Sequence, residues 1–158
     1  MTTDERDRRV RPETDRLLLD VMLGRLAVYL RTCGYDAAYA GDRGLEADAR
    51  IRETAASEGR LLLTRDRQLA AAADDVLLLT AREVENQLAE LREAGVRLTV
   101  ADEPVRCGRC NGRLEAVDDS ETPGYAPDPA AMDCWRCRDC EQVFWKGSHH
   151  ERMAAKLD

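Results

Sequence analysis

Two short leucine-rich segments, each followed by an aspartate, constrain the fold of this chain more than any other feature. Residues 61–66 have the sequence Leu-Leu-Leu-Thr-Arg-Asp, and residues 17–20 have the sequence Leu-Leu-Leu-Asp. A short apolar run bounded by polar residues is typical of a strand that is buried on both faces of a parallel sheet. Open α/β sheets bind ligands at the carboxyl ends of their strands, so Asp20 and Asp66 are the first candidates for a functional site.

The pattern around these segments alternates between strands and helices up to about residue 95. We expect strands at 17–20, 35–40, 61–64 and 76–79, and helices at 22–33, 48–58, 67–73 and from about 80 to 94. Such alternation predicts an α/β fold, with a parallel sheet covered by helices on both faces. A strand order of 2-1-3-4 makes the first and third strands neighbours at a topological switch point, which brings Asp20 close to Asp66. No glycine-rich phosphate loop follows the first strand, which disfavours a nucleotide-cofactor enzyme.

Two pairs of closely spaced cysteines mark a second part of the chain. Cys107 and Cys110 form one C-x-x-C motif, and Cys137 and Cys140 form another. Two such motifs in one short region favour a four-thiolate zinc site, because each tight turn supplies two of the four tetrahedral ligands. We therefore expect a structural zinc ribbon with a long loop between the motifs. A catalytic zinc is disfavoured, because four thiolates leave no open coordination position.

Four further side chains have more than one possible role. Cys134 is close enough in sequence to compete as a zinc ligand, but only Cys137 completes the second C-x-x-C motif. Cys33 falls on the apolar stripe of the first helix, where a buried structural cysteine is expected. His149 and His150 either contact RNA, complete a site or belong to a polar tail.

The aspartates at the strand ends suggest a second kind of metal site. Clustered carboxylate oxygens suit Mg²⁺ or Mn²⁺. Such ions activate water and stabilise the attacking and leaving oxygens in phosphodiester cleavage. For Asp20 and Asp66 we expect a metal-binding or catalytic role, and the alternative is that each caps a following helix. Asp48 is the first choice for a third acid, although it also suits a helix N-cap, and Asp42 is the second.

Charge and hydropathy limit the partners and the location. The formal net charge is -7, and the only lysines are Lys146 and Lys156. A broad basic surface for nucleic acid is therefore not expected, and any RNA contact has to use local arginine clusters. Residues 1–16 lack the apolar core of a signal peptide, and no segment approaches the roughly 20 apolar residues that span a membrane. We expect a cytoplasmic protein with no membrane partner, whose cysteines serve metal or thiol chemistry.

Several sequence segments, taken in order, resemble the Mut7-C family. They are Leu-Asp-Val-Met-Leu-Gly-Arg-Leu-Ala from Leu19, Gly-Tyr-Asp from Gly34, Glu-Gly-Arg-Leu-Leu-Leu-Thr-Arg-Asp ending at Asp66, the two cysteine motifs and Trp-Lys-Gly-Ser-His from Trp145. The resemblance covers about residues 16–153. Members of this family are PIN-like predicted ribonucleases with a C-terminal zinc ribbon.

The resemblance implies a PIN-like fold and Mg²⁺- or Mn²⁺-dependent cleavage of RNA. It assigns the acid at the end of the first strand to Asp20, the acid near the start of the second helix to Asp48, and the acid of the Thr-x-Asp motif to Asp66. The implied zinc ligands are Cys107, Cys110, Cys137 and Cys140. The expected organisation is a disordered tail at 1–15, a PIN-like domain at 16–100, a zinc ribbon at 101–150 and a C-terminal tail at 151–158.

Two functions remain open at this point. The first is a metal-dependent ribonuclease whose ribbon aids RNA binding. The second is a non-catalytic RNA- or ribosome-associated module, with the ribbon as its binding face. A local basic cluster fits phosphate contacts in either case, and its members are Arg106, Arg109, Arg113, Arg136 and Arg138.

Overall fold

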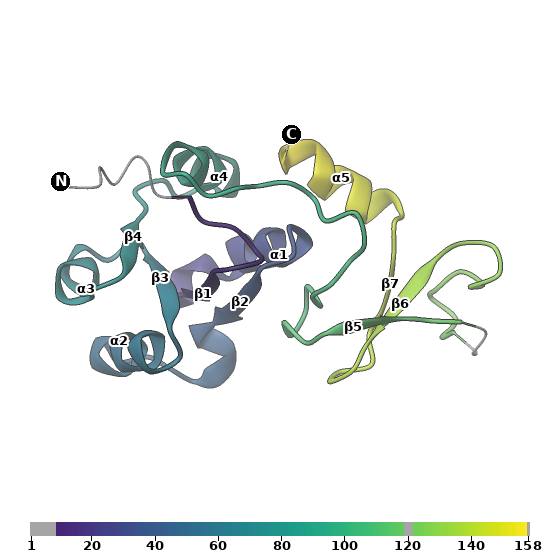
Figure 1. Ribbon diagram of the computed structural model, residues 1–158, viewed down its shortest axis with the longest axis horizontal. Coiled ribbons are helices and arrows are strands. Elements are labelled where there is room, and N and C mark those ends of the chain that lie inside the picture. The colour runs from purple at the N-terminus through teal and green to yellow at the C-terminus, as the bar shows by residue number, and fades with distance from the viewer. Residues whose placement is uncertain (1–8, 119–121, 158) are drawn as a thin grey trace.

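A four-stranded parallel sheet forms the first part of the molecule. The structure, a computed structural model, describes residues 9–118 and 122–157. The strands are β1 (Arg16–Leu19), β2 (Asp36–Tyr39), β3 (Arg60–Thr64) and β4 (Val76–Leu78). Their order is β2-β1-β3-β4, so the predicted parallel sheet and the predicted adjacency of the first and third strands are confirmed (Figure 1).

Helices cover both faces of this sheet, as expected. They are η2 (Val21–Leu23), α1 (Gly24–Thr32), η3 (Ala40–Arg43), α2 (Asp48–Ser57), α3 (Arg67–Ala72) and α4 (Val84–Glu93). Side chains of α1 and α4 pack in one core cluster, and side chains of α2 and α3 pack in a second cluster. The sheet is therefore the middle layer of three.

The two leucine runs explain why the sheet is buried on both faces. β1 and β3 pair in register, with Leu17 opposite Leu61, Leu18 opposite Leu62 and Leu19 opposite Leu63. Successive side chains of a strand point to opposite faces, so the outer leucines of each run enter the first core cluster and the middle leucines enter the second. A continuous apolar run is what a strand needs when helices cover both of its faces.

The segment before β1 is ordered where it is described. Val10 is fully buried in the first core cluster, and it forms an isolated parallel bridge with Val96. The Tyr35 hydroxyl donates a hydrogen bond to the Val10 carbonyl at 2.8 Å. The expected disorder over residues 1–15 is therefore wrong from about residue 10 onward, because a single apolar side chain anchors the segment. Residues 1–8 of that expectation lie outside the described residues.

A three-stranded antiparallel sheet forms the second part. It contains β5 (Leu114–Ala116), β6 (Cys134–Cys137) and β7 (Val143–Trp145), in the order β5-β6-β7. The segment after α4 crosses to this sheet along one side of the molecule (Figure 1). The first cysteine motif lies before β5, and the second begins at Cys137, the last residue of β6.

The chain then returns to the first part through α5 (Ser148–Leu157). Met153 and Leu157 are buried in the first core cluster, and Lys156 Nζ lies 3.1 Å from Glu85 Oε1 of α4. Figure 1 shows α5 lying between β7 and the helices of the parallel sheet. The sequence predicts a tail over residues 151–158, whereas residues 151–157 are helical and packed because Met153 and Leu157 recur at helical spacing.

A polar network joins the two parts at β2. Asn111, just after the first cysteine motif, accepts from the Ala37 N–H at 2.9 Å and donates to Asp36 Oδ1 at 2.7 Å. Arg60 also donates to Asp36 Oδ1, at 2.8 Å. Arg31 of α1 donates to the Gly108 carbonyl at 3.0 Å. The side chain of Asn111 thus satisfies an edge-strand N–H of β2 and fixes the cysteine motif against the parallel sheet.

Candidate functional site

Asp20 lies directly after β1, at the carboxyl end of the strand. Its backbone N–H donates to the Leu63 carbonyl at 3.0 Å, which keeps the residue in line with β3. The side chain is buried, with 4% of the residue exposed. Oδ1 accepts from the Val21 N–H at 2.7 Å and caps η2, and Oδ2 accepts from the Thr64 hydroxyl at 2.7 Å. One acceptor position on each oxygen is thus already used.

Asp66 follows β3 and is half-buried. Its Oδ1 accepts from the N–H groups of Gln68 at 2.8 Å and Leu69 at 3.3 Å, so Asp66 is the N-cap of α3. A carboxylate offers about four lone-pair positions, so this cap leaves acceptor capacity at Asp66 for a further ligand. Capping and metal binding are therefore compatible at this residue.

Thr64 links the two aspartates, a role that we did not predict. Its hydroxyl donates to Asp20 Oδ2 and accepts from the Asp66 N–H at 3.0 Å. The residue is fully buried at the end of the apolar run. The sequence did offer a signal, because Thr64 directly follows three leucines of a buried strand. A hydroxyl that is buried with such a strand needs a hydrogen-bond partner. Arg65, the residue before Asp66, has a buried Nε with no hydrogen-bond partner among the described residues.

The candidates for a third acid form no compact metal-binding group with this pair among the described residues. Asp48 is exposed in the first turn of α2, and the N-cap is Ala47, so the predicted capping role of Asp48 is wrong by one position. Asp42 is exposed in η3, with its Oδ2 3.9 Å from Arg31. Among the described residues, Asp20, Asp48 and Asp66 do not form a group whose ligand atoms all lie within 4.8 Å of one another. The fold juxtaposes the first and third strands, and the start of α2 does not complete a three-carboxylate group with them among the described residues.

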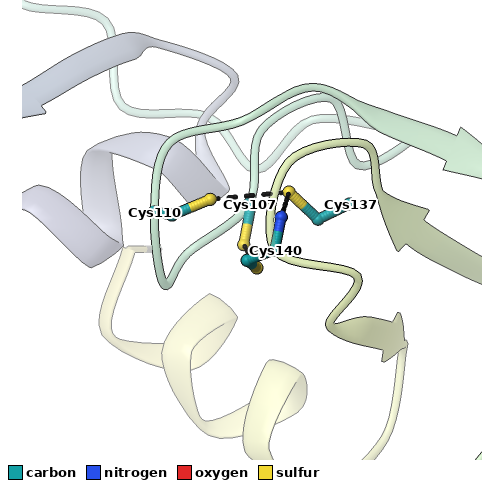
Figure 2. A group of neighbouring side chains, drawn as sticks. All are labelled: Cys107, Cys110, Cys137 and Cys140. Carbon is teal, nitrogen blue, oxygen red and sulfur yellow. Dashed lines mark hydrogen bonds between the residues drawn. The ribbon is translucent and has the colours of Figure 1, made fainter.

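The four cysteines of the two motifs do form such a group. The Sγ atoms of Cys107, Cys110, Cys137 and Cys140 all lie within 4.8 Å of one another and point toward a common centre (Figure 2). Sγ of Cys107 lies 3.7 Å from Sγ of Cys140, and Sγ of Cys110 lies 3.5 Å from Sγ of Cys137. Tetrahedral zinc with Zn–S bonds of about 2.3 Å separates its sulfurs by about 3.8 Å, so the group fits this metal.

The pKa shifts of the cysteine thiols differ within the group. Burial raises the pKa of the Cys107 thiol, and burial together with a hydrogen bond to Cys137 raises that of Cys110. Burial also opposes ionisation of Cys137, but the backbone N–H groups of Cys140 and Asp139 lower its pKa overall. Those N–H groups lie 3.5 and 3.4 Å from Sγ of Cys137. Zinc binds thiolates, so these backbone N–H groups favour the form of Cys137 that the metal needs.

The remaining candidates lie outside this group. Cys134 is buried, and its Sγ contacts the carbonyl oxygens of Met132 at 3.4 Å and Pro127 at 3.7 Å. Cys33 is buried in the first core cluster, as predicted, and burial raises the pKa of its thiol to about 12. His149 and His150 lie in the first turn of α5, so they belong to a helix and not to a polar tail.

The fold and these residues define a class of protein: an α/β domain with carboxylates at the ends of adjacent parallel strands, joined to a module built on four cysteines. The sequence model of the Mut7-C RNAse domain family matches residues 15–157, and the chain belongs to this family. Membership suggests an RNase-like function with RNA as substrate. No curated protein and no solved structure shows significant similarity to the chain. Within the described residues, no helix is long and apolar enough to cross a membrane.

Proposed function

We propose that this protein is a metal-dependent ribonuclease with a PIN-like domain over residues 16–100, and that it cleaves RNA phosphodiester bonds at the carboxyl ends of β1 and β3. The observation that carries the proposal is that Asp20 and Asp66 follow the carboxyl ends of adjacent parallel strands, where the Thr64 hydroxyl bonds both residues. Neighbouring strands lie about 4.8 Å apart, and Thr64, level with Asp20, contacts Oδ2 of Asp20 at 2.7 Å and the Asp66 N–H at 3.0 Å, which supports one shared site for the two carboxylates. Family membership supplies RNA as the substrate class.

Asp20 and Asp66 are the residues that hold Mg²⁺ or Mn²⁺ in this proposal, with Asp48 as the third acid. Carboxylate oxygens suit these hard cations, and both aspartates keep unused acceptor capacity. The bound ion supplies water activation and stabilisation of charge on the leaving oxygen. Thr64 holds Asp20 in one orientation through the bond to Oδ2. Asp48, exposed on α2, serves the site only after α2 or the substrate brings it closer.

The zinc ribbon has a structural role in this proposal and aids RNA binding. The ligands are Cys107, Cys110, Cys137 and Cys140, whose spacing supports tetrahedral zinc. Arg109 and Arg113 are exposed beside the first cysteine motif and are available to phosphates. Arg138 instead forms an ion pair of 2.8 Å with Glu115, and Arg106 lies 3.7 Å from Asp36. We place the protein in the cytoplasm, where reduced thiols persist.

A non-catalytic RNA- or ribosome-associated module is the second candidate. The observation that favours it is that both aspartates already cap helices, since Asp20 caps η2 and Asp66 caps α3. If capping were their whole role, the α/β part would be a scaffold and the ribbon would be the RNA-binding part. The two candidates differ in what the loss of one carboxylate does to cleavage.

The deciding experiment measures cleavage of single-stranded RNA with added Mn²⁺ or Mg²⁺ by the wild type and by Asp20→Asn. Asparagine keeps the shape of the side chain and removes the charge that binds the cation. The matched control is Asp74→Asn, which removes an exposed carboxylate from the loop before β4. We expect Asp20→Asn to fold and to lose at least about 100-fold in cleavage rate, as loss of one group that stabilises transition-state charge does. A folded Asp20→Asn protein that cleaves like the wild type would favour the non-catalytic module.

A further inference from the structure

A cavity of about 300 Å³ lies where α1, the ribbon and α5 meet. Val28 and Thr32 of α1 line one side, the β7 residues Phe144 and Trp145 line another, and His149 of α5 contributes a third. Its volume is at the lower end of the range for small-ligand sites, so it suits one ligand of modest size and excludes a helix. No residue of the cysteine group lines the cavity, and neither does Asp20 or Asp66.

The charge of the lining is opposite to that of the whole chain. The chain carries 31 acidic and 24 basic residues, yet the lining contains two arginines, two histidines and no carboxylate. Arg31 is buried, donates to the carbonyls of Ala37 and Gly108 and lies 3.9 Å from Asp42, and Arg106 lies 3.7 Å from Asp36. The two arginines therefore contribute positive potential that these carboxylates partly offset. His149 is exposed and His150 is half-buried, and both ring systems are available at the mouth. The cavity therefore favours an anionic group at its rim.

Aromatic side chains are rare in this chain, and two of them line the cavity side by side in sequence. Phe144 is the single phenylalanine, and Trp145 is one of two tryptophans. Tyr125 stacks on Trp145 with a centroid distance of 6.2 Å and an interplanar angle of 29°. Tyr125 does not line the cavity, so this stack holds the Trp145 ring without filling the space. Rigid aromatic faces beside cationic groups form the combination that binds unpaired bases of single-stranded nucleic acid.

We propose that this cavity binds one unpaired nucleotide of the RNA, with its base against Phe144 and Trp145 and its phosphate toward His149 and His150. The inference rests on the proposed function in taking RNA as the source of the nucleotide. Helix α1 connects the two sites, because it begins four positions after Asp20 and its last turns line the cavity. Nine helical residues span about 14 Å, so one single strand can occupy the cavity and the carboxylate site together.

The test measures binding, separately from cleavage, by fluorescence anisotropy of a labelled single-stranded RNA oligonucleotide without added Mg²⁺ or Mn²⁺. We expect Phe144→Leu, which keeps apolar volume and removes the aromatic face, to weaken binding by about 5- to 150-fold. Phe144→Tyr, which keeps the face, should bind like the wild type. His149→Ala changes an exposed residue in the first turn of α5 and should weaken binding by about two- to tenfold while the protein stays folded. Arg152→Ala, exposed on the same helix outside the lining, is the matched control and should change binding less.

Competition binding experiments distinguish a nucleotide of single-stranded RNA from a free nucleotide and from a nucleotide in a duplex. We expect the single-stranded oligonucleotide to be bound more tightly than a free nucleoside monophosphate or a duplex of the same sequence. The proposal is overturned if His149→Ala and a folded Phe144→Leu bind RNA like the wild type. It is also overturned if the duplex binds as tightly as the single strand, or if the single-stranded RNA fails to displace a bound free nucleotide. Normal cleavage by Asp20→Asn together with lost binding by Phe144→Leu would overturn only the proposed ribonuclease function.

Discussion

The hydroxyl of Thr64 donates a hydrogen bond of 2.7 Å to Oδ2 of Asp20, a residue 44 positions earlier in the chain. Both residues are buried, and the same hydroxyl accepts from the Asp66 N–H. The threonine therefore couples the ends of β1 and β3 at the place where the two candidate carboxylates lie. A buried acceptor that loses its donor costs free energy, so this contact has a measurable effect on stability as well as on the orientation of Asp20.

Thr64→Val tests this coupling. Valine keeps the branched shape but removes the hydroxyl that Asp20 and the Asp66 N–H use. We expect the free energy of unfolding to fall by about 1–3 kcal/mol and RNA cleavage to fall with it. Urea denaturation measures the first effect. Thr14→Val, which removes an exposed hydroxyl bonded to Asp15, is the control and should change stability by less than about 0.5 kcal/mol. Equal decreases in the free energy of unfolding for Thr64→Val and Thr14→Val would show that the buried hydrogen bond stabilises the fold no more than an exposed one.

Two substitutions at Asp66 separate its capping role from its proposed role in metal binding. Asparagine still accepts from the Gln68 and Leu69 N–H groups that Asp66 caps, whereas alanine does not. Asp66→Ala should lower the free energy of unfolding by about 1 kcal/mol, and Asp66→Asn should lower it by less. Both variants should lose cleavage, because both lack the charge that binds the cation. If Asp66→Asn cleaved RNA as fast as the wild type, Asp66 would have only its capping role and no role in metal binding.

The cysteine group should bind one zinc ion per chain. Cys137→Ser should abolish stoichiometric zinc, because it removes one of the four sulfurs that lie within 4.8 Å of one another. Cys134→Ser changes a buried cysteine of the same strand that lies outside the group, so its zinc content should match the wild type. Elemental analysis of protein purified without chelator measures both. Because metal binding supplies much of the folding free energy of so small a module, a chelator should also lower the unfolding temperature. Loss of zinc in Cys134→Ser with retention in Cys137→Ser would reverse the assignment.

Asp36 makes stability depend on pH in the acid range. Burial opposes its ionisation, but hydrogen bonds from Arg60 and Asn111 outweigh burial and lower its pKa below the ordinary value of 3.8. The unfolded carboxyl therefore binds a proton more readily than the folded one. The resulting stabilisation is full above the unfolded pKa and is lost as pH falls through the folded pKa.

Thermal unfolding between about pH 6 and about pH 3 should show this loss in the wild type. Asp36→Asn should be less stable at neutral pH, where Arg60 keeps Glu58 but loses one of its two carboxylate partners, and its stability should fall less steeply toward acid pH. Asp74→Asn, which removes an exposed carboxylate, should follow the wild-type curve. A steeper fall in Asp36→Asn than in the wild type would contradict the assignment.

Local pattern was enough to predict much of the fold. The leucine runs at 17–19 and 61–63 predicted buried parallel strands, because a strand covered on both faces needs apolar residues at every position. Gly34 and Gly95 directly follow the helices expected at 22–33 and about 80–94, and both adopt positive φ values, of 92° and 93°, which suit a residue that ends a helix. The C-x-x-C spacing likewise predicted which cysteines come together, since the turn geometry is local.

Boundaries were predicted less well where several residues compete for one local role. Aspartate is among the residue types most favoured at a helix N-cap. In α2, however, the N-cap is Ala47, and Asp48 is the first residue of the helix. Packing of Ile51 and Ala55 in the second core cluster fixes the rotation and start of the helix, and this burial outweighs the free energy of one cap. The same burial leaves Asp48 on the exposed face of α2.

By itself, the sequence determined the layered α/β part, the cysteine group and the two aspartates at the strand ends, because each depends on residues close together in the chain. Only the tertiary structure decided that Thr64 orients Asp20, that Asn111 joins the cysteine motif to β2, and that α5 returns to close a cavity against the ribbon. The first two contacts join residues that lie 44 and 75 positions apart. Their partners are set by strand order and by the packing of whole elements, which no local spacing encodes.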